Sequence, residues 1–420
     1  MTLTMVLVLA SGCGFRTLKR DIAVVGKASD EPAAIYGRVA TRGAVSGPLV
    51  VAVHDVATGR IAALSSLARP GEFFFALPTG TYQVAAFEDR NRDLTYQAGE
   101  EPAALFGPPT DLVLRPGEHR IDLELVVDPK GAGRIPFAIT ALAAGGKDLA
   151  FHPDLQLGMI TTIDDPRFSD ENAKLGLWNP VQFLSQAGAG VYFLEAYDPK
   201  KIPVLFVHGA MGHPGNWKHL VGTLDRSRFQ PWLVYYPTAP HLDRIARGLV
   251  RTLGALQVKY GFSRLILVAH SMGGLVTRAA VNDAVASATG ARVVRLPAFV
   301  SISSPWNGHA GAELGVKYAP VVAPSWEDMA PDSPFLRQLP ETALPPECEY
   351  SLFFSYRGGS DFSKEANDGT VTVASELSMP IQRQAAHVMG FNEGHTSILE
   401  SDDVAAHLNA TLLRASGALP

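Results

Sequence analysis

The sequence predicts an α/β fold with a doubly wound, mostly parallel sheet and a lid insertion, preceded by a small all-β sandwich domain. Two observations predict this architecture. Residues 34–127 consist of short runs in which apolar and polar side chains alternate, separated by Gly and Pro, as in a small antiparallel sandwich. From residue 201 onward, continuous apolar runs alternate with stretches of helical periodicity, which is typical of a parallel sheet covered by helices on both faces.

Composition limits the class of protein. The chain has 420 residues, 47% of them hydrophobic and 18% charged, so it can form two domains with a sizeable core. A net charge of −5 without a basic tract argues against nucleic acid as a partner. Two cysteines, Cys13 and Cys348, cannot make a disulfide framework. The sequence predicts no cofactor.

The first residues contain a pattern typical of exported proteins. A short apolar run at residues 3–10 is followed by Ser-Gly and then Cys13, which resembles the lipobox of bacterial lipoproteins. The resemblance implies a signal peptide over residues 1–13, acylation of Cys13, and a lipid anchor in the bacterial cell envelope, at the outer membrane. Ala10 stands where that family usually has Leu, and no Lys or Arg precedes the run, so the alternative is an ordinary secretory signal with an incidental cysteine.

The rest of the chain divides into four predicted parts. They are a polar tether at 14–31, the sandwich at 32–128, a connecting segment at 129–190, and the α/β domain at 191–420 with its lid at about 308–348. Residues 73–87 resemble the transthyretin-like and carboxypeptidase-regulatory sandwich modules of secreted bacterial proteins.

The α/β domain is predicted element by element. We expect buried strands at 202–207, 230–236, 264–269, 297–302 and 350–356, an outer strand at 191–194, and helices at 216–224, 242–260 and 272–287.

A serine lies where one of these strands meets its helix. The strand ends at His270, Ser271 follows, and the helix begins after it. A sharp turn at this point forces the serine into strained backbone angles, so the residues two before and two after it must be small. Here they are Ala269 and Gly273. The pattern predicts Ser271 as a nucleophile, and a simple strand-to-helix turn is the alternative.

This strand-turn-helix motif, Ala-His-Ser-Met-Gly, resembles that of bacterial lipases and esterases in the α/β-hydrolase superfamily. Residues 205–212 resemble the His-Gly turn that supplies an oxyanion donor in the same family. The resemblance implies that the backbone N–H groups of Ala210 and Met272 form the oxyanion hole. We expect His208 to hold its loop by a hydrogen bond rather than to act in catalysis.

The family order of the triad, serine then acid then histidine, implies the other two members. His395 lies in a loop between a predicted last strand and the C-terminal helix, where lipases carry their base. Asp368, in a motif that resembles the Asp-Gly-x-Val of lipases, is the predicted acid, with Asp361 as the second candidate. A plain turn is the alternative interpretation of residues 368–369.

These residues together predict a serine hydrolase that cleaves carboxylic esters, with an ester or lipid substrate and an apolar acyl pocket under the lid. The alternatives are a non-catalytic surface-binding lipoprotein on the same fold, and a hydrolase of amide, thioester or polyester bonds. Because every candidate lies at or after Ala210, we expect a chain that begins near residue 150 to hydrolyse a soluble ester at the full rate.

One acidic loop of the sandwich has the oxygen spacing of a calcium site. Its candidate ligands are Asp89, Asn91, Asp93 and Glu100. Leu94 stands where such loops need Gly, and a solvated acidic turn is the alternative. Elsewhere the sequence predicts no metal site.

Overall fold

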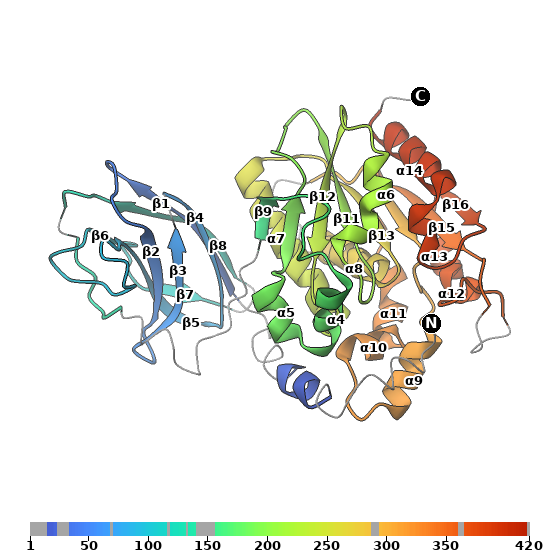
Figure 1. Cartoon of the computed structure of the whole chain (residues 1–420), viewed down its shortest axis with the longest axis horizontal. Helices are drawn as coiled ribbons and strands as arrows, with labels where there is room; N and C mark the ends of the chain where they lie inside the picture. The colour runs from blue at the N-terminus through green and yellow to red at the C-terminus, as the bar shows by residue number, and fades with distance from the viewer. Residues whose placement is uncertain are drawn as a thin grey trace. The chain divides into compact units, whose positions relative to one another are not determined.

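The computed structural model describes residues 15–22, 33–67, 70–115, 118–131, 133–139, 156–286, 294–359 and 365–417. The chain forms two compact units (Figure 1). The large unit combines Met1–Val25 with Pro153–Pro420, and the small unit is Gly26–His152. Two segments that are separated in sequence by the small unit therefore form the large unit.

The small unit is an all-β sandwich, as the alternation predicts. One sheet has the order β4-β1-β8 and the other β3-β2-β5-β6, with β7 paired to β5. The strands are β1 (Ala33–Thr41), β2 (Leu49–Asp55), β3 (Arg60–Leu67), β4 (Gly71–Leu77), β5 (Gly80–Glu88), β6 (Ala103–Leu105), β7 (Leu112–Leu114) and β8 (His119–Val127). Alternate residues of both sheets, such as Ile35, Val51 and Phe73, meet in one core because successive side chains point to opposite faces of a strand.

The large unit contains an eight-stranded, mostly parallel sheet with the order β16-β15-β14-β13-β11-β12-β10-β9. Its strands are β9 (Gln156–Ile160), β10 (Gly190–Phe193), β11 (Ile202–Val207), β12 (Phe229–Tyr235), β13 (Ile266–His270), β14 (Ala298–Ile302), β15 (Glu349–Ser355) and β16 (His387–Phe391). Only the β10–β12 pair of this described sheet is antiparallel. The five predicted buried strands are all present within a residue or two.

Helices cover the sheet because its strands are apolar on both sides. They are α4 (Asp170–Trp178), α5 (Pro180–Gln186), η1 (Pro214–Trp217), α6 (Lys218–Gly222), α7 (Leu242–Tyr260), α8 (Met272–Ala286), α9 (Ala310–Tyr318), α10 (Pro324–Met329), α11 (Pro334–Gln338), η2 (Leu339–Glu341), α12 (Val373–Glu376), α13 (Met379–Gln382), η3 (Ser397–Glu400) and α14 (Asp402–Ala415). Leu205 and Val207 of β11 share a core with α7 and α8, whereas Phe206 between them contacts Trp217 of η1.

The large unit begins earlier than the sequence indicated. Residues 156–190, which were assigned to a connecting segment, instead supply β9, α4 and α5. β9 pairs in parallel with β10 and forms the edge of the sheet, so the predicted outer strand at 191–194 is the second strand from that edge. The sequence signal was weak here because β9 is only half covered, with Met159 and Ile160 exposed.

Part of the tether predicted at 14–31 differs from the structure, and its residues 14 and 23–31 lie outside the described residues. Residues 15–22 form an α-helix of the large unit, called the N-terminal helix below, and Leu18 and Asp21 on it are fully buried. The polar residues Arg16, Lys19 and Arg20 that suggested a tether lie on its exposed face. A short amphipathic helix with a charged face has the same composition as a solvated linker.

The predicted lid region contains α9, α10, α11 and η2, between β14 and β15. Trp326, Met329 and Leu336 from these short helices pack onto the main core of the unit. In the described part of the chain, no helix has the length and apolar character needed to cross a bilayer.

Candidate active site

Ser271 lies in a strained turn between β13 and α8. Its φ of 55° is in the left-handed region that side chains with a Cβ rarely adopt. The turn brings α8 so close to β11 that a Cβ on Gly273 would lie 2.4 Å from the carbonyl oxygen of Val207. A Cβ added to Gly209 would lie 2.7 Å from the Cβ of Ser271. Glycine is therefore required at both positions. The turn places Ser271 at the carboxyl end of β13.

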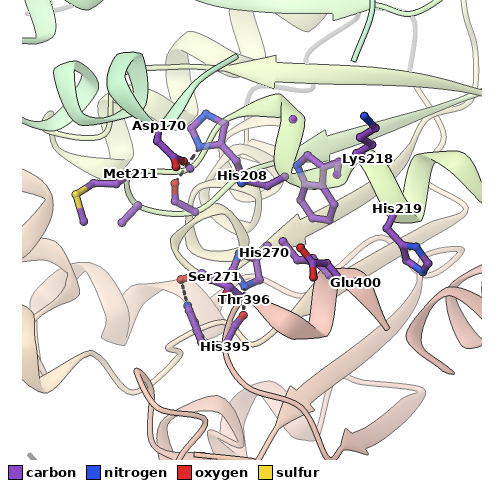
Figure 2. A pocket seen from close by; sticks show the side chains of 17 residues that line it. Asp170, His208, Met211, Lys218, His219, His270, Ser271, His395, Thr396 and Glu400 are labelled. Carbon is purple, nitrogen blue, oxygen red and sulfur yellow. Dashed lines mark hydrogen bonds between the residues drawn. The ribbon is translucent and has the colours of Figure 1, made fainter. Parts of the chain in front are cut away.

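Two hydrogen bonds connect Ser271 to the loops after β15 and β16. Nε2 of His395 lies 2.9 Å from Oγ of Ser271, and Nδ1 lies 2.6 Å from Oδ2 of Asp368. The side chains of Ser271 and His395 point toward one another in Figure 2. The structure thus brings together the three residues named from the sequence. Asp361, the second candidate acid, lies outside the described residues.

Asp368 is held as a carboxylate although it is buried. Its Oδ1 accepts the backbone N–H groups of Thr370 and Val371 at 2.9 and 2.7 Å, and the Ser355 hydroxyl donates to Oδ2 at 2.9 Å. Burial alone would raise the pKa of Asp368, but the hydrogen bond and charge of His395 and these backbone donors lower it to about 2. An ionised Asp368 fixes the tautomer of His395 with the proton on Nδ1, which leaves Nε2 free to accept from Ser271.

A second carboxyl group, that of Glu376 on α12, lies behind Asp368. It is 1% exposed, and its Oε2 accepts the backbone N–H of Ser355 at 3.1 Å. Burial and the negative charge of Asp368 raise the pKa of Glu376 to about 10. Two adjacent buried carboxyls cannot both ionise cheaply, so Asp368 carries the charge and Glu376 keeps its proton.

Two buried histidines support the site without facing the solvent. Nε2 of His270 donates to the carbonyl oxygen of His395 at 2.7 Å and so fixes the backbone of that loop. Nδ1 of His208 donates to the Gly209 carbonyl at 2.9 Å, and its ring stacks on Tyr236. This hydrogen bond is the loop-holding role predicted for His208. Burial lowers the pKa of both rings to about 3, so both are neutral.

The two predicted oxyanion donors follow the ends of neighbouring strands, β11 and β13. Met272 begins α8, and Ala210 follows the His208-Gly209 turn at the end of β11. Neither of their backbone N–H groups is bonded to an acceptor within the described residues. Ala210 lines both of the cavities that Ser271 also lines.

Ser271 and His395 open onto two cavities of different character. The first, shown in Figure 2, has a volume of about 690 Å³ and a mixed polar and apolar lining that includes the charged residues Asp170, Lys218 and Glu400. The second has a volume of about 640 Å³ and is lined by apolar residues, called the apolar cavity below. They are Phe15, Leu177, Trp178, Met211, Ala312, Leu314, Tyr318, Trp326, Met329 and Val371. Both volumes are within the range of small-molecule sites.

The predicted calcium loop is organised by hydrogen bonds instead. Asp89 is buried and accepts the backbone N–H groups of Asp93 and Leu94, while Oδ1 of Asp93 accepts that of Thr95. Among the described residues, no group of three His, Cys, Asp or Glu side chains could hold a metal ion. The spacing of Asp89, Asn91, Asp93 and Glu100 therefore produces a turn network here, since the oxygens of Asp89 are already used by backbone donors.

Of the two cysteines, the structure describes only Cys348. Cys348 is a free thiol, half-buried, and burial raises its pKa to about 12, so it is not an activated nucleophile. Cys13 lies outside the described residues.

Sequence reasoning missed three residues of the site. Glu376 and Phe15 carry no motif, and only packing brings them to Asp368 and to the apolar cavity. His270 could have been found, because a histidine at the end of a buried strand, next to the strained serine, must use its ring nitrogen on a nearby backbone group.

Comparison with known proteins agrees with the fold. Residues 204–407 match the model of a family described as the alpha/beta hydrolase family. No curated protein matches the chain by sequence.

Several solved structures resemble part of the chain. The product of the gene lin2722 from Listeria innocua is 17% identical, with 50% of this chain and 94% of that one covered and a TM-score of 0.40. The mature lipase BlEst2 from Bacillus licheniformis is 18% identical over 52% and 94%, also with 0.40. Phospholipase PlaB from Legionella pneumophila is 19% identical over 42% and 45%, with 0.35.

The order of the strands and the strained serine between β13 and α8 agree with the match of the family model. The large unit therefore has the fold of an alpha/beta hydrolase, and residues 204–407 are similar to that family.

Proposed function

We propose that the protein is a serine hydrolase that cleaves carboxylic ester bonds, with Ser271, His395 and Asp368 as its catalytic residues. The observation that carries the proposal is the continuous chain of hydrogen bonds from the Ser271 hydroxyl through His395 to Asp368. This arrangement can remove a proton from a serine hydroxyl while the resulting imidazolium is stabilised by a carboxylate. The apolar cavity beside Ser271 supports an acyl group as the part of the substrate that is bound.

The reaction would proceed in two halves. Oγ of Ser271 attacks the ester carbonyl carbon while Nε2 of His395 takes the hydroxyl proton, and the backbone N–H groups of Ala210 and Met272 stabilise the negative oxygen. His395 then gives the proton to the departing alkoxide, which leaves as the alcohol. A water molecule attacks the acyl-enzyme with His395 again as base, and the carboxylic acid and free Ser271 result.

A fluorophosphonate probe and a series of p-nitrophenyl esters test this proposal. We expect the wild-type protein to be labelled at Ser271 and to hydrolyse the esters, and Ser271→Ala to abolish both without unfolding the protein. Asp368→Asn should slow ester turnover by about 10⁴-fold while slow labelling persists, because Asp368 orients the base rather than attacking. Lys19→Ala, on the exposed face of the N-terminal helix, is the control.

Two results would contradict the proposal. A wild-type protein that is folded but is neither labelled nor active on any ester would support the non-catalytic binding lipoprotein instead. Hydrolysis of amide or thioester substrates in clear preference to esters of the same acyl group would change the bond that is cleaved and leave the catalytic residues unchanged.

We also propose that Cys13 is acylated and anchors the protein to the bacterial envelope. The support is the apolar run at residues 3–10 and the small residues before the cysteine. Cys13→Ser should move the protein from membrane to soluble fractions and prevent incorporation of an alkyne-labelled fatty acid. Unchanged membrane association of this variant would exclude Cys13 as the anchor.

A further inference from the structure

The N-terminal helix is docked onto the large unit by one face. Phe15, Leu18 and Asp21 are the buried residues of residues 15–22, at 9%, 0% and 0% exposure. They recur every three residues, so they share one side of the helix. Arg16, Lys19 and Arg20 are exposed on the other side. The helix is held in place although the small unit, residues 26–152, separates it in sequence from the elements it contacts.

The contacts of Leu18 show where the helix lies. It packs in a small apolar cluster with Leu177 of α4, Ala239 after β12 and Ala323 before α10. Figure 1 shows this unlabelled blue helix in the large unit, close to α10. The N-terminal helix therefore contacts α4 and the lid insertion at the same time.

Asp21 fixes the helix by a polar contact inside this apolar surface. Its Oδ2 accepts the backbone N–H of Val181 in the first turn of α5 at 3.3 Å, and its Oδ1 accepts two N–H groups of Arg20 at 3.0 and 2.9 Å. A carboxylate with no exposed surface is stable only when such donors replace water. The contact is specific, because it pairs one buried side chain with one backbone group of another element.

Phe15 reaches the apolar cavity next to Ser271. Its ring packs edge-on against Trp178 at 5.6 Å, and Trp178 packs edge-on against Trp326 of α10 at 5.8 Å. All three rings line the cavity that also contains Ser271 and His395. The wall of the cavity is thus built from three distant parts of the sequence, and the N-terminal helix supplies one of them.

We propose that Phe15 and the N-terminal helix determine the acyl-chain specificity of this enzyme, by forming the wall that a long linear acyl chain contacts when its ester carbonyl is at Ser271. The inference rests on the proposed function and names its substrate class, esters of long-chain carboxylic acids. Phe15 and Ser271 line the same apolar cavity, so we expect the contribution of the helix to grow with the length of the acyl chain. The inference depends on residues 15–22 and does not require that Cys13 be acylated.

The test measures kcat/KM for p-nitrophenyl esters from butanoate to palmitate in the full chain. Phe15→Ala should lower kcat/KM for palmitate by about tenfold, the loss expected when contacts to roughly two methylene groups disappear. Activity on butanoate should fall less than activity on palmitate, so the ratio of the two kcat/KM values is the quantity that tests the wall. Phe15→Leu should keep most of the palmitate activity because it keeps an apolar wall.

Asp21→Asn tests the helix without changing the cavity lining. The amide replaces the carboxylate at the Val181 N–H and weakens its pairing with Arg20, so the helix should undock more often and palmitate activity should fall as in Phe15→Ala. Lys19→Ala lies on the same helix but on its exposed face, and it should keep the wild-type profile.

The possible results separate the inference from the proposed function. If Phe15→Ala and Asp21→Asn keep the wild-type chain-length profile while Ser271 is labelled by a fluorophosphonate, the inference is wrong and the proposed function stands. If both variants lose butanoate activity as much as palmitate activity, the helix supports the catalytic residues in general and does not determine specificity. If the wild type itself is not labelled, the proposed function fails first.

Discussion

Two carboxyl groups, those of Asp368 and Glu376, are neighbours behind His395, and only one of them is ionised. Asp368 has its pKa lowered to about 2 and is ionised, and Glu376 has its pKa raised to about 10 and is neutral. The difference follows from the donors. Asp368 accepts from His395, Ser355 and two backbone N–H groups, whereas Oε1 of Glu376 has no partner among the described residues.

The buried Glu376 predicts an unusual dependence of stability on pH. Its folded pKa is raised, so between about pH 4.5 and about pH 10 the unfolded carboxyl is ionised while the folded one keeps its proton. Stability from this group is therefore lost as the pH rises through that window. Glu376→Gln, which cannot ionise, should be more stable than the wild type at pH 7 and above, by an amount that grows by up to about 1.4 kcal/mol per pH unit.

Urea unfolding at pH 5, 7 and 9, followed by the fluorescence of the large unit, measures this difference. Glu347→Gln is the matched control, because Glu347 is exposed and its replacement should leave the pH dependence unchanged. Parallel pH profiles for Glu376→Gln and the wild type would show that Glu376 is ionised in the folded protein. Ester turnover of Glu376→Gln should stay close to that of the wild type, because Asp368 keeps its charge and its donors.

At the scale of elements, the lid insertion is fixed to the body of the large unit by α10. Oδ2 of Asp328 accepts the backbone N–H of Leu242, the first residue of α7, at 2.6 Å, and both carboxylate oxygens lie 3.2 Å from Nδ1 of His241. The hydrogen bond to Asp328 raises the pKa of His241, against the effect of burial, and Glu327 and Asp243 add to it. This contact ties the helix that carries Trp326 and Met329 to the start of α7.

Asp328→Asn should remove the negative charge of this contact and keep its hydrogen bond, because the amide oxygen can still accept the Leu242 N–H. A histidine with a raised folded pKa stabilises the protein fully below its unfolded pKa of about 6.5, and loses that contribution as the pH rises through the folded value. We therefore expect Asp328→Asn to lower stability by about 1 kcal/mol or less at pH 6 and by a smaller amount at pH 9.

Thermal unfolding of the two proteins at both pH values measures the effect, with the exposed Glu313→Gln of α9 as control. An equal loss of stability at pH 6 and pH 9 would mean that the charge of His241 makes no contribution. Faster turnover of bulky esters by Asp328→Asn would further show that the contact restrains the insertion.

At the scale of the whole molecule, two separate segments of the chain form the large unit. Residues 1–25 and 153–420 form one unit, and 26–152 form the other. The sheet of the large unit lies entirely within residues 156–391, so a chain that begins at Pro153 contains all eight strands and the three proposed catalytic residues. It lacks both the sandwich and the N-terminal helix. From the sequence alone, we expect such a chain to hydrolyse a short, soluble ester at close to the full-length rate.

The structure changes that expectation for long substrates. A chain that begins at Pro153 should fold, react with a fluorophosphonate and hydrolyse p-nitrophenyl butanoate, but its kcat/KM for palmitate should fall about tenfold or more because the wall around Phe15 is missing. The measurement is the ratio of the two rates, with circular dichroism to confirm folding. Adding the N-terminal helix as a separate peptide should restore part of the palmitate activity. A truncated chain with the wild-type ratio would remove the role that we assign to the helix.

The sequence by itself determined much of the fold and the core of the site. α7 occupies the predicted residues 242–260, and five buried strands lie where continuous apolar runs occur. Ser271 was named from its strand-turn-helix motif, and His395 and Asp368 from the resemblance to lipases; the structure joins the three by hydrogen bonds. Local patterns were sufficient here because periodicity sets the type of element, and a strained turn accepts only a few residue types. The catalytic role of the three residues stays a prediction.

Only the tertiary structure decided which distant segments meet. Nothing local in residues 14–31 distinguishes a tether from a helix that packs on α4 and α10, because the difference is the apolar surface that the rest of the chain provides. Glu376 likewise becomes a neutral carboxyl only because folding buries it beside Asp368. Such contacts depend on packing and charge summed over residues far apart in sequence, and no single motif encodes them.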